Sequence, residues 1–328
     1  LSSIFSYDNN NVSDHLYYSA EHYNGIADGG LVHEMRTVYE KWLSSTTLSY
    51  KALWKDVHSF GVLAGFEAEK TTMDFTRSTG KGLPNSKLHT VSAAGTTEAS
   101  GFRQGYAMLS VLTKMDYNYD ERYFGSVSYR ADASSRLSPE TRWGHFWSVA
   151  GAWKIINEKW MSPARSAAKL SELKLRVSYG VNGTLPSVYY GYMSLMDYTY
   201  KYMGEAGGAV VSPANHNLTW ETSYNANAGV DFGFFHQRLR GTVEYFNRRS
   251  MNLLQDVPIS MTTGFSTSLQ NVGEITNQGV EFELSGDIIA VGDWRWSAGI
   301  NGAFVTNRVD KLYDGRDIIW YDPTGNDK

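Results

Sequence analysis

Apolar and polar residues alternate strictly along several stretches of the chain. In residues 224–234, aromatic and aliphatic side chains occupy the even positions, while Asn, Gly and Asp occupy the odd positions. Residues 172–181, 239–245 and 280–284 alternate in the same way. A period of two residues is the pattern of a β-strand whose two faces meet different surroundings. These stretches are therefore predicted to be strands with one apolar and one polar face.

Extended over the whole chain, the pattern predicts an all-β protein. Eleven strands are expected, at residues 1–7, 37–54, 58–79, 101–117, 122–135, 143–156, 172–183, 222–235, 239–250, 279–287 and 294–307. Strong helical periodicity is absent, and residues 162–173 are the one stretch expected to contain a short helix.

The connections between these strands alternate between short and long. Tight links are expected at 55–58, 118–121 and 236–238, and long ones at 8–36, 80–100, 184–221 and 251–278. Two links, 136–142 and 157–171, are of intermediate length. In an up-and-down meander, every second connection lies at the same end of the sheet. One end therefore carries tight turns and the other carries loops, which is the layout of a transmembrane antiparallel β-barrel.

A soluble β-sandwich also alternates and also has hairpins, but two features disfavour it. Many expected strands exceed the roughly 5–6 residues usual in globular sheets and reach the ~9–11 residues that cross a bilayer. Aromatic residues also gather near the strand ends, as two interfacial belts require. These are Trp143, Trp147 and Trp220 at the loop end and Trp54, Trp294 and Trp296 at the turn end.

The barrel reading assigns each face of the sheet to one solvent. The residues expected to face the membrane are Trp143, Trp147, Trp294, Trp296, Phe232 and Phe234. Those expected to face a water-filled or protein-plugged interior are Arg130, Asp132, Lys174, Arg176, Asn225, Asn227, Asp231, Arg240, Glu244, Glu281 and Glu283. The polar set is either a ladder of ion pairs that stiffens the wall or the lining of a solute path. Because open sheet edges are not tolerated in hydrocarbon, the eleven strands need partners beyond this chain.

Composition narrows the function further. The net charge is −4, no block of Lys and Arg is present, and we expect no binding to nucleic acid. The absence of Cys excludes disulfides, thiolate zinc sites and a cysteine nucleophile. The eight His residues include no zincin pair, and no phosphate-binding loop or nucleophile elbow occurs. We therefore expect no cofactor, no metal and no enzymatic activity.

Residues 130–161 read RADASSRLSPETRWGHFWSVAGAWKIINEKWM. They resemble the Arg-Asp-Gly-Ser-Ser-Arg-Phe, Arg-Trp-Gly and Phe-Trp-Ser signature of SusC/RagA-type TonB-dependent outer-membrane transporters of Bacteroidetes, and four further stretches resemble the same family in the same order. The other four are SIFSYD with HLYYS (3–8, 15–19), LKLRVSYGVNGTLP (173–186), NLTWETSYNANAGVDFGFF (217–235) and TTGFSTSLQNVGEITNQGVEFEL (262–284). Departures are local: Ala131 and Ala133 alter the first motif, and His216 stands where Pro is usual.

The resemblance implies a barrel of about 22 strands that is filled by an N-terminal plug domain and coupled through a TonB box to TonB, ExbB and ExbD. It also implies a SusD-like surface lipoprotein that caps the mouth, and an assembly of two transporter–lid pairs in the outer membrane of a Gram-negative bacterium. Residues 1–328 are then expected to be part of one barrel domain, with the plug and the last strands outside this chain.

The loop at 187–208 is rich in Tyr and Met, and clustered aromatic side chains often mark a contact surface. It is expected to contact substrate, to dock the lid, or to pack inside the barrel mouth. The candidates are Tyr189, Tyr190, Tyr192, Tyr198 and Tyr200.

These expectations favour import of glycan oligomers or peptides across the outer membrane by a TonB-powered transporter. A passive porin with the same wall and an open lumen is the alternative. An outer-membrane enzyme is the least favoured, because no acid, base and nucleophile converge in the sequence.

Overall fold

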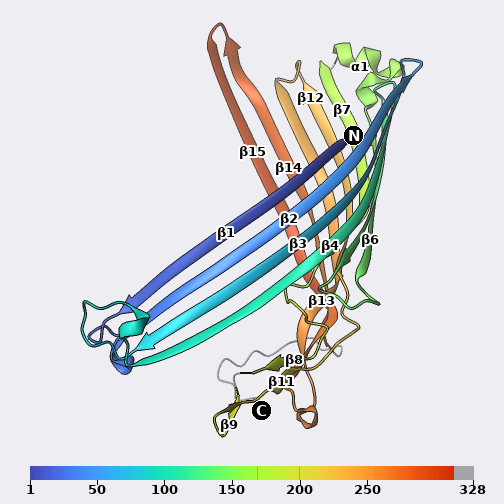
Figure 1. The fold of residues 1–328 in the computed structure, drawn as a ribbon. Helices are drawn as coiled ribbons and strands as arrows, with labels where there is room; N and C mark the ends of the chain where they lie inside the picture. Colours follow the sequence, from blue (N-terminus) through green and yellow to red (C-terminus); the bar gives the residue numbers. More distant parts are fainter. Residues whose placement is uncertain (168, 199, 314–328) are drawn as a thin grey trace. The chain divides into compact units, whose positions relative to one another are not determined.

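The computed structural model describes residues 1–167, 169–198 and 200–313, and eleven long strands dominate it (Figure 1). They are β1 (Ser2–Tyr18), β2 (Leu31–Trp54), β3 (His58–Lys81), β4 (Thr96–Tyr119), β5 (Tyr123–Ser134), β6 (Trp143–Trp153), β7 (Leu170–Thr184), β12 (Glu221–Phe234), β13 (Leu239–Pro258), β14 (Thr267–Val291) and β15 (Trp294–Lys311). Each strand is hydrogen-bonded to the next long strand in the sequence, in one sheet whose order runs from β1 to β15.

This topology confirms the expected all-β, up-and-down antiparallel arrangement. Within the described residues, the order starts at β1 and ends at β15 without joining these two strands. The sheet is therefore part of a larger barrel rather than a closed one, since a barrel in hydrocarbon must have no open edge. The last fifteen residues of the expected barrel domain, 314–328, lie outside the described residues.

All eleven expected strands are present, but several are longer than the alternation indicated. β1 continues to Tyr18, β2 begins at Leu31, β13 ends at Pro258 and β14 begins at Thr267. The long links expected at 8–36 and 251–278 were therefore wrong in extent. The physical reason is that alternation marks a strand only where its two faces meet different solvents. The extra residues include polar runs such as Asp8–Val12, DNNNV, where both faces carry polar groups.

The tight turns occur where they were expected. Lys55 and Asp56 both have positive φ, of 51° and 55°, and so do Asp120 and Glu121, at 50° and 51°. Two consecutive left-handed residues are the geometry of type I′ hairpin turns, whose twist matches that of the flanking strands.

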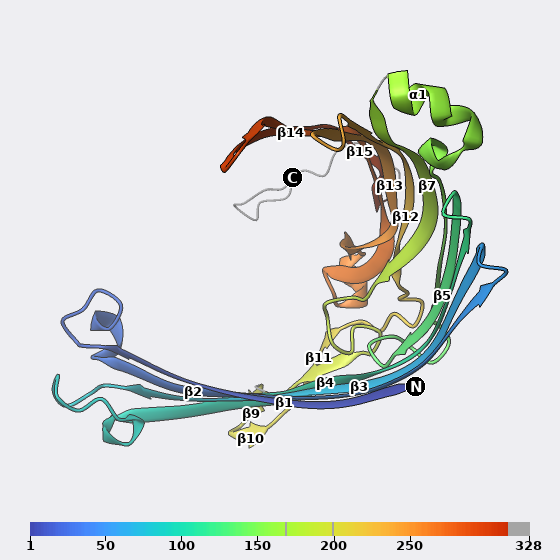
Figure 2. The same ribbon diagram turned by 90° about the horizontal axis from the view of Figure 1, so that it is seen from above.

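In the described part of the chain, smaller elements occur in five of the connections: η1 (Ile26–Asp28), η2 (Val91–Ala93) and η5 (Met261–Thr263) each stand alone in one, and two connections carry several. The link from β7 to β12 carries four short strands, β8 (Leu195–Asp197), β9 (Lys201–Tyr202), β10 (Glu205–Ala206) and β11 (Ala209–Ser212), which pair as β8 with β11 and β9 with β10. The link from β6 to β7 carries η3 (Ile155–Asn157), η4 (Lys159–Met161) and α1 (Ser162–Ala167). The short helix expected at 162–173 is thus confirmed over Ser162–Ala167, and β7 begins at Leu170 within the same stretch. Figure 2 shows α1 beside β7.

No helix among the described residues combines the length and the apolar character needed to cross a membrane.

Two compact units make up the chain. One comprises residues 2–46 and 67–109, and the other contains the remaining described residues, including β5 to β15. In the first unit, the ring of His33 is buried with its Nδ1 2.9 Å from Thr79 Oγ1. Lys41 and Glu69 form an ion pair there, with 3.0 Å between Nζ and Oε2.

In the second unit, strand register aligns side chains of one kind across successive strands. One apolar row joins β6 to β15 through Gly151, Val177, Ala228, Tyr245, Val280 and Phe304. Val177, Tyr245 and Phe304 are 59%, 47% and 74% exposed. An apolar row this exposed across a sheet is what a lipid-facing surface requires.

Candidate functional site

The most connected part of the polar face centres on Arg176 of β7. Its Nε donates to Asp231 Oδ1 at 3.1 Å, and an Nη2 hydrogen bond of 3.1 Å reaches Thr242 Oγ1. Its Nη1 forms an ion pair with Glu244. Thr242 in turn donates to Asp231 Oδ1 at 2.8 Å. One guanidinium therefore joins β7, β12 and β13, and it forms ion pairs with two carboxylates.

Gly229 of β12 makes this arrangement possible. In the strand register it lies opposite both Arg176 on one side and Glu244 on the other. A Cβ placed there would lie 3.0 Å from Arg176 Cζ, closer than ordinary van der Waals contact. The missing side chain lets the arginine cross β12 and reach Glu244.

The other predicted members of the polar ladder make mostly local contacts. Arg130 Nε lies 2.7 Å from Asp132 Oδ1, and its Nη2 donates to Ser110 Oγ at 2.9 Å. The remaining contacts join Arg248 to Asn225, Asn227 to Ser178, Arg240 to Ser285 and Lys174 to the ring of Phe124. Within the described part of the chain, Glu281 and Glu283 have no side-chain hydrogen bond or ion pair.

A polar groove of about 600 Å³ lies on this face. Its lining includes Asn182, Asn225, Asn227, Arg248, Asn277 and Glu281. Neutral amides both donate and accept hydrogen bonds, so the groove can bind groups rich in hydroxyls or amides. Across the described residues, no cluster of three His, Asp or Glu side chains could hold a metal ion.

The loop end of the second unit is held by hydrogen bonds between the signature segments. Ser138 Oγ donates to the carbonyl of His216 at 2.8 Å, and Thr141 Oγ1 donates to that of Leu218 at 2.6 Å. Trp220 Nε1 donates to the carbonyl of Arg142 at 3.0 Å. The motifs at 130–161 and 217–235 therefore bind each other. The sequence identified these residues, but their pattern did not indicate this structural role.

Trp220 was expected in an exposed aromatic belt, and this was wrong. Its side chain is 5% exposed and packs edge-on against Phe146, with 5.2 Å between ring centroids. Phe146 itself fills the space over Gly144 and Gly183, where an added Cβ would meet its ring at 2.4 and 2.0 Å. The indole is buried because two glycines make room for the ring against which it packs.

The predicted membrane-facing residues differ in their exposure. Trp143, Trp147, Trp294 and Trp296 are large exposed side chains; Trp143 begins β6, Trp147 lies near the middle of β6, and Trp294 and Trp296 lie in the first three residues of β15. Phe232 and Phe234 are half-buried, with their ring centroids 6.1 Å apart. Their contact with lipid stays a prediction.

The tyrosine-rich loop places its five candidates differently. Tyr192 is buried, and its ring centroid lies 6.2 Å from that of His216. Tyr189 lies under the guanidinium of Arg136, with 4.5 Å between its ring centroid and Cζ. Tyr190, which is half-buried, adopts a positive φ of 58°. Tyr198 and Tyr200 are 68% and 55% exposed and so offer the larger surfaces for a contact.

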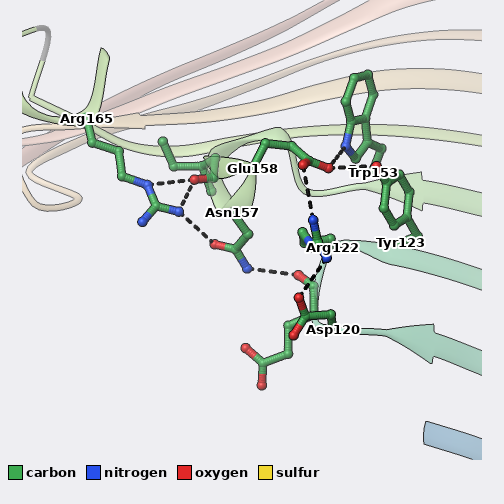
Figure 3. A network of polar contacts seen from close by, with 9 residues as sticks. Asp120, Arg122, Tyr123, Trp153, Asn157, Glu158 and Arg165 are labelled. Carbon is green, nitrogen blue, oxygen red and sulfur yellow. Dashed lines mark hydrogen bonds and ion pairs between the residues drawn. The ribbon is translucent and has the colours of Figure 1, made fainter. Parts of the chain in front are cut away.

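A charged network that the sequence did not indicate lies at the turn end (Figure 3). Glu158, which is buried, accepts hydrogen bonds from the hydroxyl of Tyr123 at 2.7 Å and from Trp153 Nε1 at 3.0 Å. Arg122 Nη1 lies 3.3 Å from Glu158 Oε2, and its Nη2 lies 2.8 Å from Asp120 Oδ2. The pKa of Glu158 is lowered, most strongly by the hydrogen bond from the Tyr123 hydroxyl and further by the Trp153 indole and by Arg122. The link between β6 and β7 is thereby tied to the turn between β4 and β5.

These features match one family along nearly the whole chain. The model for the TonB dependent receptor-like β-barrel matches residues 2–327. The chain belongs to this family. It is 31% identical over 237 residues to the TonB-dependent receptor SusC of Bacteroides thetaiotaomicron, covering 70% of this chain and 23% of that protein. It is 28% identical over 331 residues to the TonB-dependent receptor P26 of Formosa agariphila, covering 97% and 33%.

The solved structure of the RagAB peptide transporter superposes with a TM-score of 0.84 at 26% identity, covering 96% of this chain and 35% of that one. The chain thus spans about a third or less of the length of these relatives. As a TonB-dependent receptor barrel of the SusC and RagA type, it is an outer-membrane protein of a Gram-negative bacterium. The matched proteins are receptors and transporters, not enzymes.

Proposed function

We propose that this chain forms part of the barrel wall of a transporter. The transporter imports glycan oligomers or peptides into the periplasm, and TonB supplies the energy for import. The observation that carries the proposal is the sorting of side chains between the two faces. An exposed apolar row crosses β6 to β15, while the opposite face carries the Arg176 network and the amide-lined groove. Such a wall suits a bilayer on one side and a hydrated solute on the other.

The rest of the machinery would come from outside residues 1–328. A plug domain with a TonB box would fill the lumen, the last strands would close the barrel, and a SusD-like lipoprotein would cover the mouth. Similarity to the RagAB peptide transporter and to SusC supports this assembly. The exposed Tyr198 and Tyr200 are the proposed contacts for the lid or for incoming solute.

Conductance and uptake together test this proposal. The intact protein in a planar bilayer should show almost no conductance at rest, because a plugged lumen passes few ions. A strain carrying the gene should take up labelled peptides or glycan oligomers, and deletion of tonB should abolish uptake. High resting conductance together with TonB-independent uptake would instead identify a passive porin.

The groove can be tested in the same assay. Exchanging Asn225 and Asn227 for Ala removes two amides from its lining, and we expect a higher KM for uptake because bound solute loses hydrogen bonds. Val177→Ala, on the opposite face of neighbouring β7, is the matched control and should leave the KM unchanged. An unchanged KM in the double variant would show that solute does not bind in the groove.

A further inference from the structure

The helical link between β6 and β7 packs against the apolar side of the sheet. Ile155, Ile156 and Met161 form a buried cluster, and Trp153, Leu170 and Leu173 pack against it. Leu173 pairs in register with Phe232, and Trp153 pairs with Leu175, so both belong to the apolar face. The link therefore lies on the lipid side of the sheet, at the tight-turn end, where a barrel meets the periplasmic surface of the membrane.

A groove of about 880 Å³ lies beside this link, and its lining has an apolar part and a cationic part. Leu170, Leu239 and Ile288 provide apolar surface, and Leu239 continues the apolar face of β13. Arg165, Lys169 and Arg238 provide three cations. A cationic rim beside an apolar wall, at the boundary between lipid and water, matches the two parts of a phospholipid.

None of the three cations forms a salt bridge with a carboxylate among the described residues. Arg165 donates to the carbonyl of Ile156 and to Asn157 Oδ1, which are both neutral acceptors. Lys169 Nζ lies 5.8 Å from the ring centroid of Phe235, and Arg238 donates to the backbone carbonyl of Asp287 at 3.4 Å. Their positive charge is therefore available to an anion.

One carboxylate also lines the groove, and it is already engaged. Asp287 Oδ1 accepts a hydrogen bond from Ser297 Oγ at 2.7 Å, and its Oδ2 lies 3.8 Å from Arg295 Nη2. Counting the four charged side chains of the lining as three cations and one anion leaves an excess of positive charge.

We propose that this groove binds one anionic phospholipid of the periplasmic leaflet. The phosphate lies among Arg165, Lys169 and Arg238, and one acyl chain lies along Leu239 and Ile288. Bound there, the lipid joins the helical link to the turn between β12 and β13 and to the end of β14, because the three cations come from the first two segments and Ile288 from the third.

Native mass spectrometry of the full-length transporter tests this proposal. After delipidation in detergent, the protein is titrated with phosphatidylglycerol, phosphatidylcholine or inorganic phosphate, and bound lipid is counted. We expect one phosphatidylglycerol to bind at least about tenfold more tightly than phosphatidylcholine, because near-surface Lys and Arg attract anionic lipids. Inorganic phosphate should compete weakly, because it offers nothing to the apolar wall.

Charge-matched variants localise the site. Arg165→Gln, Lys169→Gln and Arg238→Gln together should remove the preference for phosphatidylglycerol. The control exchanges Lys55, Lys154 and Lys159 for Gln, which removes the same charge at the turn end but outside the groove lining. Equal loss in both triple variants would mean nonspecific attraction and would overturn the proposal, as would equal binding of the two lipids or full displacement by phosphate.

A second variant tests the apolar wall and guards against misfolding. Ile288→Ser keeps every charge and should weaken phosphatidylglycerol binding, whereas unchanged binding would contradict the assigned acyl-chain path. Folding of each variant is checked by its mobility in SDS gel electrophoresis without heating. If the triple variant does not fold, the single variant Arg238→Gln is used instead. Lipid counting does not depend on solute uptake, so failure of this site and failure of the proposed transport function are distinguishable.

Discussion

The two ends of the second unit are held together by different chemistry. At the loop end, Ser138, Thr141 and Trp220 donate neutral hydrogen bonds to backbone carbonyls, and the rings of Phe146 and Trp220 are buried. At the turn end, the carboxylate of Glu158 accepts hydrogen bonds and faces a guanidinium. Neutral hydrogen bonds do not depend on protonation, whereas a buried carboxylate does. The two ends should therefore respond differently to mutation and to pH.

The largest effect is expected from Trp220→Ala at the loop end. This change removes a buried indole, its edge-on contact with Phe146 and its hydrogen bond to the carbonyl of Arg142. Large-to-small changes of this kind destabilise by about 3–5 kcal/mol. Urea unfolding of the full-length protein in lipid vesicles measures it. Trp143→Ala, which removes an exposed indole, is the control, and an equal loss there would contradict the structural role given to Trp220.

A smaller effect is expected from Gly183→Ala. The added methyl group would lie 2.0 Å from the ring of Phe146 and would displace it from Trp220. Overpacking of a filled site costs about 1–3 kcal/mol, which should appear as a lower urea midpoint. Gly125→Ala is the matched control, because nothing lies within 4 Å of its Cβ position. If both variants unfolded at the same urea concentration, Phe146 would not be confined as described.

The smallest effect at neutral pH is expected from Glu158→Gln at the turn end, and its signature is pH dependence. The pKa of Glu158 is lowered from 4.5, chiefly by the Tyr123 hydroxyl. A lowered folded-state pKa adds stability above the unfolded-state pKa, and this stability is lost as pH falls through the folded-state value. The wild type should therefore lose more stability than the variant below about pH 4.5. Parallel profiles from pH 7 to pH 3 would contradict this assignment.

The alternation predicted the strands where two different solvents meet the sheet, and it failed elsewhere. Residues 224–234 alternate without exception and lie in β12, whereas the polar run in β1 carries no such pattern. A strand with polar groups on both faces is invisible to a period-two search. The family motifs compensated in part, because HLYYS at 15–19 covers the last residues of β1.

The alternation of residues along the strands predicted which side chains lie on the polar face, but it did not predict which of them contact one another. Arg176, Asp231 and Glu244 were all placed on one face, yet nothing in the sequence indicated that one arginine reaches the other two. That contact depends on Gly229, which lies between Arg176 and Glu244 only once the register of three strands is set. The Glu158 network was missed for a similar reason, since its partners come from the turn before β5, from the start of β5 and from the end of β6.

The bridge made by Arg176 limits how three neighbouring strands of the sheet can move relative to one another. One side chain fastens three consecutive strands on the same face, so these strands cannot slide or splay independently without breaking an ion pair. The spacing between β7, β12 and β13 is therefore held constant on this face. A change in the width of this stretch of sheet would have to break the ion pair of Arg176 with Asp231 or with Glu244.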